Sequence, residues 1–210
     1  MQTESTPAPT RRIGVYGGTF DPPHLGHLIL AETALDSLNL ARVLFVPAAE
    51  PPHKDTSSVR APVADRVAMV TLAIEDNPRF EVSRVDVDRP GPHYSVDMLR
   101  LLHDQYPDAE LVFMVGGDSL RNLPIWSRPA ELITLAKLGV MRRPGFKPDL
   151  SHLETHLPGL SARIEWVEAP LIDIAASHLA HCIAHGHSVR YQIPDKVIAY
   201  ITQHGLYTTP

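Results

Sequence analysis

The sequence GGTFDPPHLGH, residues 17–27, stands between two segments of different character. Residues 12–16 before it form a short apolar run, which is typical of a buried strand. Residues 28–35 after it carry the apolar stripe of a helix. We therefore expect a strand-to-helix turn, in which Gly17 and Gly18 take positive φ angles and allow a ligand to approach the backbone closely.

Two histidines lie at the predicted start of this helix. His24 and His27 are three residues apart, so their side chains share one face of the first turn. Free backbone N–H groups and the positive end of the helix dipole attract phosphate at such a position. Two imidazoles add further donors, and Gly26 leaves the space between them open. The turn is therefore a candidate phosphate site, and the simpler alternative is a tight turn with two surface histidines.

This stretch resembles the HxGH signature of the nucleotidyltransferase superfamily, and at full length it is similar to the motif of the bacterial nicotinate-mononucleotide adenylyltransferases. The resemblance extends from about Arg12 to Tyr207. It implies adenylyl transfer from ATP to nicotinate mononucleotide, a step of NAD biosynthesis that yields deamido-NAD and pyrophosphate. It also implies that Mg2+ is the cofactor and accompanies ATP.

Composition limits the class of protein. The chain has 210 residues, of which 44% are hydrophobic, and this suits one soluble domain. Its net charge of −5 argues against general binding of nucleic acid or of an anionic membrane, and no apolar run is long enough to span a bilayer. Cys182 is the only cysteine, which excludes an internal disulfide and fits a reducing cytoplasm. For the oligomeric state, these numbers are compatible with both a monomer and a homo-oligomer.

Apolar runs alternate with amphipathic stretches along the chain. Strands are predicted at 12–16, 41–47, 80–87, 111–115, 138–141 and 164–167. Helices are predicted at 28–35, 62–76, 94–106, 129–135, 177–184 and 194–204. This order favours an α/β fold, Rossmann-like and doubly wound, with a mostly parallel sheet and helices on both faces. Residues 1–11 are expected to form a disordered tail and residues 12–210 a single nucleotidyltransferase domain, with a small C-terminal helical part at about 170–210.

Ligands of such sheets bind beyond the carboxyl ends of the strands, where the loops converge. The loops expected at this edge are residues 17–24, 47–54, 116–119 and 142–145. Neither the G-x-G-x-x-G fingerprint nor the G-x-x-x-x-G-K-[ST] phosphate loop occurs in the sequence. The turn at 17–27 therefore stays the candidate phosphate cradle.

The resemblance assigns roles to residues of these loops. His24 and His27 are expected to donate to the phosphates of ATP, and Lys54 to neutralise the departing pyrophosphate. The wider ATP and phosphate site is expected to contain Gly17, Gly18, Thr19, Phe20, Gly26, Gly116, Asp118, Arg143 and Ser177. The mononucleotide is expected to bind Tyr94, Ser95 and Trp126.

Several of these residues also have an ordinary structural explanation. Lys54 follows a Pro-rich loop, where a lysine is usually solvated. Ser95 begins a helix and could serve only as its cap, although free N–H groups there also suit a carboxylate. Trp126 follows a proline-containing turn, where a tryptophan more often fills a packing gap. The resemblance, which stacks the pyridine ring of the mononucleotide on a tryptophan at this position, favours a functional role.

The C-terminal part departs from the pattern of the family. The family carries Ser-Ser-Thr-x-Ile-Arg before its last segment, and its hydroxyls, helix N-terminus and arginine hold the ATP phosphates. Residues 175–180 here are AASHLA, so that Ser177 keeps one hydroxyl and Ala180 stands at the arginine position. A lost charged hydrogen bond costs about 1.5–3 kcal/mol. The change implies one of three outcomes: ATP binds more weakly, groups from elsewhere in the chain replace the lost phosphate contacts, or the enzyme is impaired.

The same predicted helix carries His178, His181, Cys182 and His185 at the spacing of one helical face. Protonated His178 or His181 would be a substitute for the missing arginine. Nitrogen and sulfur ligands would also suit zinc, but four ligands on one straight helix cannot close a tetrahedron around an ion. We expect ordinary, partly buried histidines and no metal held by protein side chains.

The sequence leaves other functions open. Residues 117–120 read GDSL, the label of a class of hydrolases, and Asp149 with His152 supplies the D-x-x-H of that class, but the two motifs lie at the wrong places in the chain. A catalytically impaired nucleotide-binding relative would fit the changed string at 175–180. A related adenylyltransferase would act on another phosphate monoester, such as nicotinamide mononucleotide or phosphopantetheine.

Overall fold

One six-stranded sheet forms the centre of the molecule in the computed structural model, which describes residues 11–50, 60–142 and 148–208. The strands are β1 (Arg11–Gly18), β2 (Arg42–Pro47), β3 (Phe80–Val82), β4 (Ala109–Gly116), β5 (Lys137–Arg142) and β6 (Ile164–Glu168). All neighbouring strands are parallel, in the order β3-β2-β1-β4-β5-β6. The order reverses between β1 and β4, and this is the position where ligands of doubly wound sheets bind.

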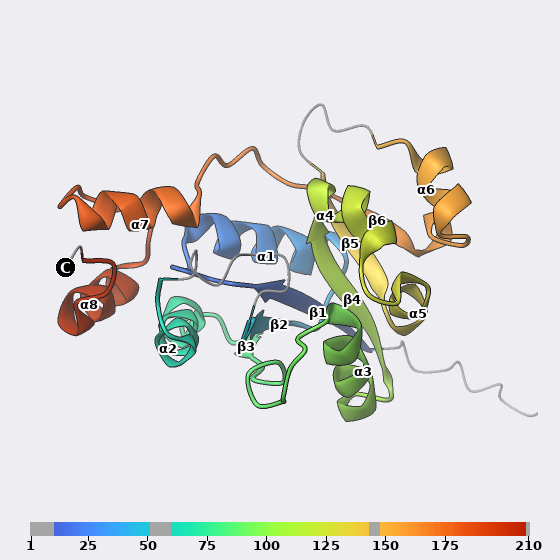
Figure 1. Ribbon diagram of the computed structural model, residues 1–210, viewed down its shortest axis with the longest axis horizontal. Helices are drawn as coiled ribbons and strands as arrows, with labels where there is room; N and C mark the ends of the chain where they lie inside the picture. The colour runs from blue at the N-terminus through green and yellow to red at the C-terminus, as the bar shows by residue number, and fades with distance from the viewer. Residues whose placement is uncertain (1–10, 51–59, 143–147, 209–210) are drawn as a thin grey trace, which may run out of the picture.

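Helices connect the strands and cover both faces of the sheet (Figure 1). They are α1 (Leu25–Ser37), α2 (Val63–Ile74), α3 (Ser95–Gln105), α4 (Gly117–Asn122), α5 (Pro129–Leu135), α6 (Leu150–His156), α7 (Ala176–Ala184) and α8 (Asp195–His204), with short 3-10 turns η2 (Leu123–Ile125) and η3 (Ser161–Arg163). The predicted α/β fold, Rossmann-like and doubly wound with a parallel sheet, is confirmed.

Alternate residues of the strands face opposite sides of the sheet and fill two separate cores. Ile13 and Val15 of β1 pack in one core with side chains of α3 and α5, such as Leu99. Val43 and Phe45 of β2 pack in the other core with side chains of α1 and α2. Parallel strands that are buried on both faces need nearly continuous apolar sequences, and the runs read from the sequence supply them.

The C-terminal helices lie beyond the sheet. α7 and α8 pack with α2 at one end of the molecule, and α6 lies at the other end (Figure 1). Their shared core contains Met69 of α2, Leu179 of α7 and Val197 of α8. Gly205, with φ of 60°, ends α8 as expected. Within the described ranges, no helix has both the length and the apolar character needed to cross a membrane.

Several strand boundaries differ from the sequence prediction, and two of the differences have a clear cause in the hydrogen bonding. Arg11, which the sequence assigns to the tail, pairs with Ala109 and so begins β1. β3 ends at Val82 instead of continuing to residue 87. The reason is a turn, in which the N–H groups of residues 87 and 88 both donate to the carbonyl of Arg84.

Two short helices are absent from the prediction. α4 begins directly after β4 with Gly116 as its N-cap, where the sequence predicts a loop at 116–119. α6 is capped by Asp149, whose Oδ1 accepts the backbone N–H of His152 at 3.0 Å. The D-x-x-H sequence is therefore a helix cap, which gives it a structural role and weakens the hydrolase interpretation.

Candidate active site

A buried carboxylate anchors the turn between β1 and α1. Oδ1 of Asp21 accepts the hydroxyl of Tyr207 at 2.6 Å and the N–H of Ala61 at 3.2 Å, and Oδ2 accepts the N–H of Arg60 at 2.8 Å. Burial, together with the hydrogen bond to Asp21, raises the pKa of Tyr207, so its hydroxyl stays a donor. The turn is therefore held by residues from two distant parts of the chain.

The glycines of this turn behave differently from the prediction. Gly17 and Gly18 belong to β1 and do not have positive φ angles, and the residue that does is Phe20, with φ of 51°. A Cβ on Gly18 would lie 2.8 Å from the Phe20 ring. The role of Gly18 is therefore to make room for this buried ring, whose packing holds the left-handed backbone of Phe20.

The two histidines come together at the start of α1, as the spacing predicts. Their rings are stacked with centroids 3.7 Å apart and an interplanar angle of 24°. His24 is the N-cap of α1, and its backbone N–H donates to Nδ1 of His27 at 3.1 Å. Because Nδ1 of His27 accepts this bond, the proton of the neutral ring lies on Nε2, where it is a donor.

Burial controls the charge of His24. Only 6% of the residue is exposed, and desolvation lowers its pKa to about 4, so the imidazole is neutral at pH 7. The ring faces the backbone N–H of His27, but within the described residues Nδ1 makes no well-aligned hydrogen bond. A Cβ on Gly26 would lie 3.0 Å from the His24 ring, so glycine at this position is required for the ring to stay where it is.

A cavity of about 250 Å³, called here the histidine cavity, is lined by both rings. Its lining combines polar side chains with apolar ones from the ends of β5 and the segment before α7, among them Tyr16, His24, His27, Met141, Ile172 and Ile174. Burial raises the pKa of Tyr16, which keeps its hydroxyl neutral. Apolar walls with a few donors suit a nucleotide, which presents both a flat base and phosphates.

A second cavity of about 190 Å³, called here the tryptophan cavity, lies on the other side of the ends of β1 and β4. Its lining includes Gly17, Gly18, Asp86, His93, Ser95 and Trp126. Trp126 meets Phe113 edge-on, with ring centroids 6.3 Å apart. The two cavities share Tyr16, Val115 and Gly116. They are therefore adjacent, and a Cβ on Gly116 would meet nothing within 4 Å, so the space above this residue is open.

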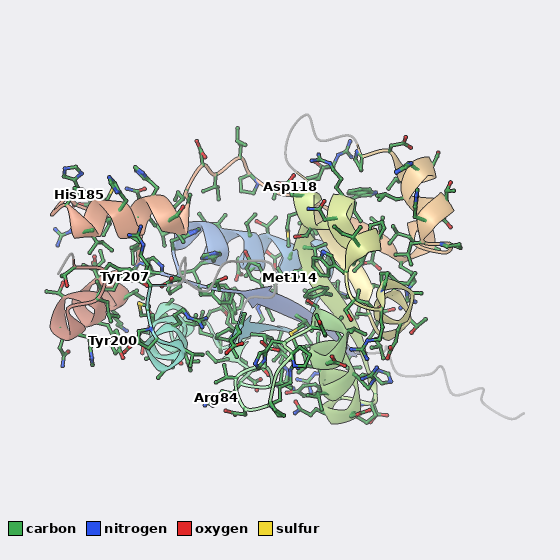
Figure 2. All side chains as sticks on the ribbon, in the orientation of Figure 1. Arg84, Met114, Asp118, His185, Tyr200 and Tyr207 are labelled. Carbon is green, nitrogen blue, oxygen red and sulfur yellow. The ribbon has the colours of Figure 1, made fainter. Side chains whose placement is uncertain are left out.

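Several other predicted site residues in the described ranges line neither cavity. Asp118 lies at the start of α4 (Figure 2), is exposed, and has its Oδ1 3.4 Å from Nη1 of Arg121. Tyr94 is the exposed N-cap of α3, and Ser177 is exposed on α7. The carbonyl of Thr19 accepts from Arg66 at 2.9 Å. Lys54 and Arg143 lie outside the described residues.

The histidines and the cysteine of α7 and its C-cap make two contacts. Nε2 of His178 lies 3.5 Å from Sγ of Cys182, and the rings of His181 and His185 have centroids 4.0 Å apart (His185 is labelled in Figure 2). In the part of the chain that the structure describes, no three potential ligands gather around a common metal position. The pKa of His181 is lowered, first by the charge of His185 and then by burial. This shift weakens the hypothesis that protonated His181 replaces the missing arginine at Ala180.

Sequence reasoning missed four polar residues near the two cavities. Asp86, His93 and Ser119 line the tryptophan cavity. Arg66 lies on the buried face of α2 and is 1% exposed. The available signal was a charged residue within the apolar stripe of a predicted helix, which is rare unless the charge has partners. Its guanidinium donates to the carbonyls of Thr19, Ala48, Ala49 and Ala61.

Comparison with protein families and sequences gives a consistent result. The family model described as cytidylyltransferase-like matches residues 15–192. A protein of Thermomicrobium roseum is 50% identical over 198 residues, which cover 94% of this chain and 92% of that protein. A protein of Roseiflexus sp. is 46% identical over 195 residues, which cover 93% of this chain and 97% of that protein. Both are named "probable nicotinate-nucleotide adenylyltransferase".

Solved structures with the same fold come from Plasmodium falciparum. Two structures of its nicotinic acid mononucleotide adenylyltransferase, one complexed with APC and one with NaAD, each give a TM-score of 0.72. The likeness covers 94% of this chain and 97% of each of those chains. At 19% sequence identity it supports the fold alone.

Proposed function

This chain belongs to the cytidylyltransferase-like family, among its nicotinate-nucleotide adenylyltransferases, and from this premise we infer that it transfers the adenylyl group of ATP to nicotinate mononucleotide in NAD biosynthesis. The products are deamido-NAD and pyrophosphate. The observation that carries the proposal is the pair of cavities that meet over Gly116. A transfer between two nucleotides needs two adjacent sites that open to each other where the reacting groups meet.

The chemistry needs little more than positioning and charge stabilisation. The 5′-phosphate of the mononucleotide is already a competent nucleophile, so it attacks the α-phosphorus of ATP and expels pyrophosphate without a covalent enzyme intermediate. Negative charge then develops on the oxygens around the α-phosphorus. Donors that are fixed before the reaction stabilise this charge most effectively, because they need no reorganisation.

His24 and His27 are the donors proposed for the triphosphate. Both rings are held at the start of α1 by their stacking and by the hydrogen bond from the His24 backbone to Nδ1 of His27. The free N–H groups and dipole of this 13-residue helix add to their effect. A role in binding the same nucleotide remains a prediction from the family resemblance for four further residues, Lys54, Asp118, Arg143 and Ser177.

The mononucleotide is proposed to occupy the tryptophan cavity. Trp126 offers a ring face or edge to the pyridine ring, and Ser95 opens α3 at the wall of the same cavity. The positive end of α3 would attract a carboxylate. Tyr94 precedes Ser95 as the N-cap and contributes through its backbone in this proposal.

Mg²⁺ is proposed to arrive with ATP. The carboxylates near the cavities are a poor set of ligands, because Asp86 is paired with Arg89 at 2.5 Å and Asp118 is exposed beside Arg121. Mg²⁺ commonly keeps several waters and binds substrate phosphates, which fits these residues. When bound, the ion would neutralise part of the triphosphate charge. A cytoplasmic location stays a prediction from the single cysteine, Cys182.

The test is release of pyrophosphate from ATP that depends on nicotinate mononucleotide. His24→Ala and His27→Ala are each expected to lower kcat by about 10²–10³, the usual effect of removing one transition-state donor. His156→Ala removes an exposed histidine of α6 and is the matched control, with unchanged kcat. Near-normal turnover of both active-site variants, or pyrophosphate release without the mononucleotide, would refute the assignment.

A further inference from the structure

The tryptophan cavity contains a histidine that the proposed reaction has not used. His93 belongs to the segment that connects β3 with α3. Its side chain is 7% exposed and lines the cavity. Its Nδ1 is buried and has no hydrogen-bond partner among the described residues. Oδ2 of Asp86 lies 3.6 Å from this nitrogen, which is close enough for electrostatic attraction but too far for a hydrogen bond.

Such a nitrogen is unusual, because buried polar groups in folded proteins are nearly always hydrogen-bonded. Because the His93 ring lines the tryptophan cavity, a ligand of that cavity is placed to supply a partner to the ring.

The surroundings of His93 are arranged to accept an anion. Asp86 would repel a negative ligand, but Arg89 neutralises it through two contacts with Oδ1, at 2.5 and 3.0 Å. Arg89 also donates to the carbonyls of Pro92 and Tyr94, at 2.8 and 3.2 Å. The pair of Asp86 and Arg89 therefore holds the segment on both sides of His93 in place.

The start of α3 favours the same charge. Ser95 is the first residue of this 11-residue helix and lines the cavity with His93. A negative group in this cavity would therefore meet the positive end of a helix dipole and an imidazole at once. The amide of nicotinamide mononucleotide also has an acceptor oxygen, but it lacks the charge that strengthens both interactions.

We propose that His93 is a specificity-determining residue, whose buried imidazole donates a hydrogen bond to the pyridine carboxylate of nicotinate mononucleotide and so favours this substrate over nicotinamide mononucleotide. The proposal rests on the proposed function, because it assigns the tryptophan cavity to the mononucleotide. The roles of Asp86 and Arg89 are to position His93 and to remove the repulsion that an unpaired carboxylate would create.

The experiment measures kcat/KM of the full chain with nicotinate and with nicotinamide mononucleotide, at saturating ATP and Mg²⁺. His93→Leu is expected to lower the ratio of acid to amide at least tenfold, with the KM for ATP changed less than twofold. His93→Gln keeps a side-chain N–H donor and is expected to restore a substantial part of the ratio. His103→Leu makes the same chemical change at an exposed position of α3 and is expected to leave the ratio unchanged.

The outcomes separate this inference from the proposed function. If the unmodified protein turns over nicotinate mononucleotide and His93→Leu leaves the ratio of acid to amide unchanged, the inference is wrong and the proposed function stands. Equal losses for both substrates would also overturn it, since they indicate a structural role for His93. If the unmodified protein uses neither mononucleotide, the proposed function itself fails.

Discussion

His24 shows how a single side chain can be prepared for its role by its surroundings. Its ring is stacked on His27 and lies so close to Gly26 that a Cβ there would be 3.0 Å away, and the residue is only 6% exposed. A charged imidazole would lose its hydration there, so burial lowers the pKa of His24 to about 4. The result is a neutral donor in a fixed orientation, which can meet a triphosphate without first releasing water.

This pKa predicts how stability depends on pH. Between pH 6.5 and pH 4 the unfolded chain protonates His24 and the folded chain does not, so the free energy of unfolding falls as the pH is lowered. The expected contribution of His24 to that fall is up to about 3 kcal/mol. Urea unfolding of the protein and of His24→Gln, at several pH values, isolates this contribution from those of the other histidines. Parallel pH profiles for the two proteins would contradict the prediction.

Residues whose role depends on local spacing could be predicted, and those held by distant contacts could not. The stacking of His24 on His27 follows from a three-residue separation at the start of a helix. The positive φ of Phe20 depends on how its ring packs over Gly18. His93 and Asp86 both line the tryptophan cavity, with Nδ1 of His93 3.6 Å from Oδ2 of Asp86. No pattern in the sequence indicates such a contact.

At the scale of elements, α2 does more than cover the sheet. Its buried face includes Arg66, which reaches the turn after β1 through Thr19 and the segment after β2 through Ala48 and Ala49. Burial lowers the pKa of Arg66, and the nearby charge of Asp21 opposes this shift. The sequence predicts the long elements because their apolar pattern is repeated over several turns, but it misses α4 and α6, which extend over less than two full turns. Of the helices this short, only α5 is predicted.

The substitution Arg66→Met tests the role of this residue in joining the elements. It keeps much of the volume but leaves four carbonyl groups without their charged donor, so the free energy of unfolding is expected to fall by about 3 kcal/mol or more. The corresponding decrease in Tm is roughly 6–12 °C. Calorimetry measures it.

Arg84→Met is the matched control, because Arg84 (labelled in Figure 2) is exposed. Its guanidinium forms a surface ion pair with Asp88 at 2.7 Å. The effect of the substitution on stability is expected to be small, because a solvent-exposed ion pair contributes little. Similar losses of stability in the two variants would show that the buried hydrogen bonds of Arg66 contribute no more than a surface ion pair.

At the scale of the whole molecule, the end of the chain returns to its first turn. The hydroxyl of Tyr207 donates to Asp21 at 2.6 Å, and the core shared by α2, α7 and α8 lies beside this contact. The parallel direction of the strands could be expected from alternating elements and right-handed crossovers. The long-range hydrogen bond could not, because nothing in the local sequence links residue 207 to residue 21. The extent of the expected single domain, residues 12–210, stays a prediction that this contact supports.

The substitution Tyr207→Phe removes this connection. Asp21 then keeps its two backbone N–H donors but loses the hydroxyl, so stability is expected to fall by about 1–2 kcal/mol. Tyr200→Phe is the control, because its hydroxyl donates to Asp65 at 2.8 Å in a more accessible position, and it is expected to cost less. Urea unfolding compares the two variants. An equal or smaller loss for Tyr207→Phe would argue against a structural link between the C-terminal helices and the turn.

The central claim is that ATP and the mononucleotide occupy adjacent cavities on the two sides of Gly116, with the triphosphate at the start of α1. A crystal structure of the protein with a nonhydrolysable ATP analogue and nicotinate mononucleotide tests it most directly. We expect phosphate oxygens within about 2.7–3.2 Å of ring nitrogens of His24 or His27, and the pyridine ring against Trp126. A triphosphate bound away from these two histidines, or a mononucleotide outside the tryptophan cavity, would contradict the account.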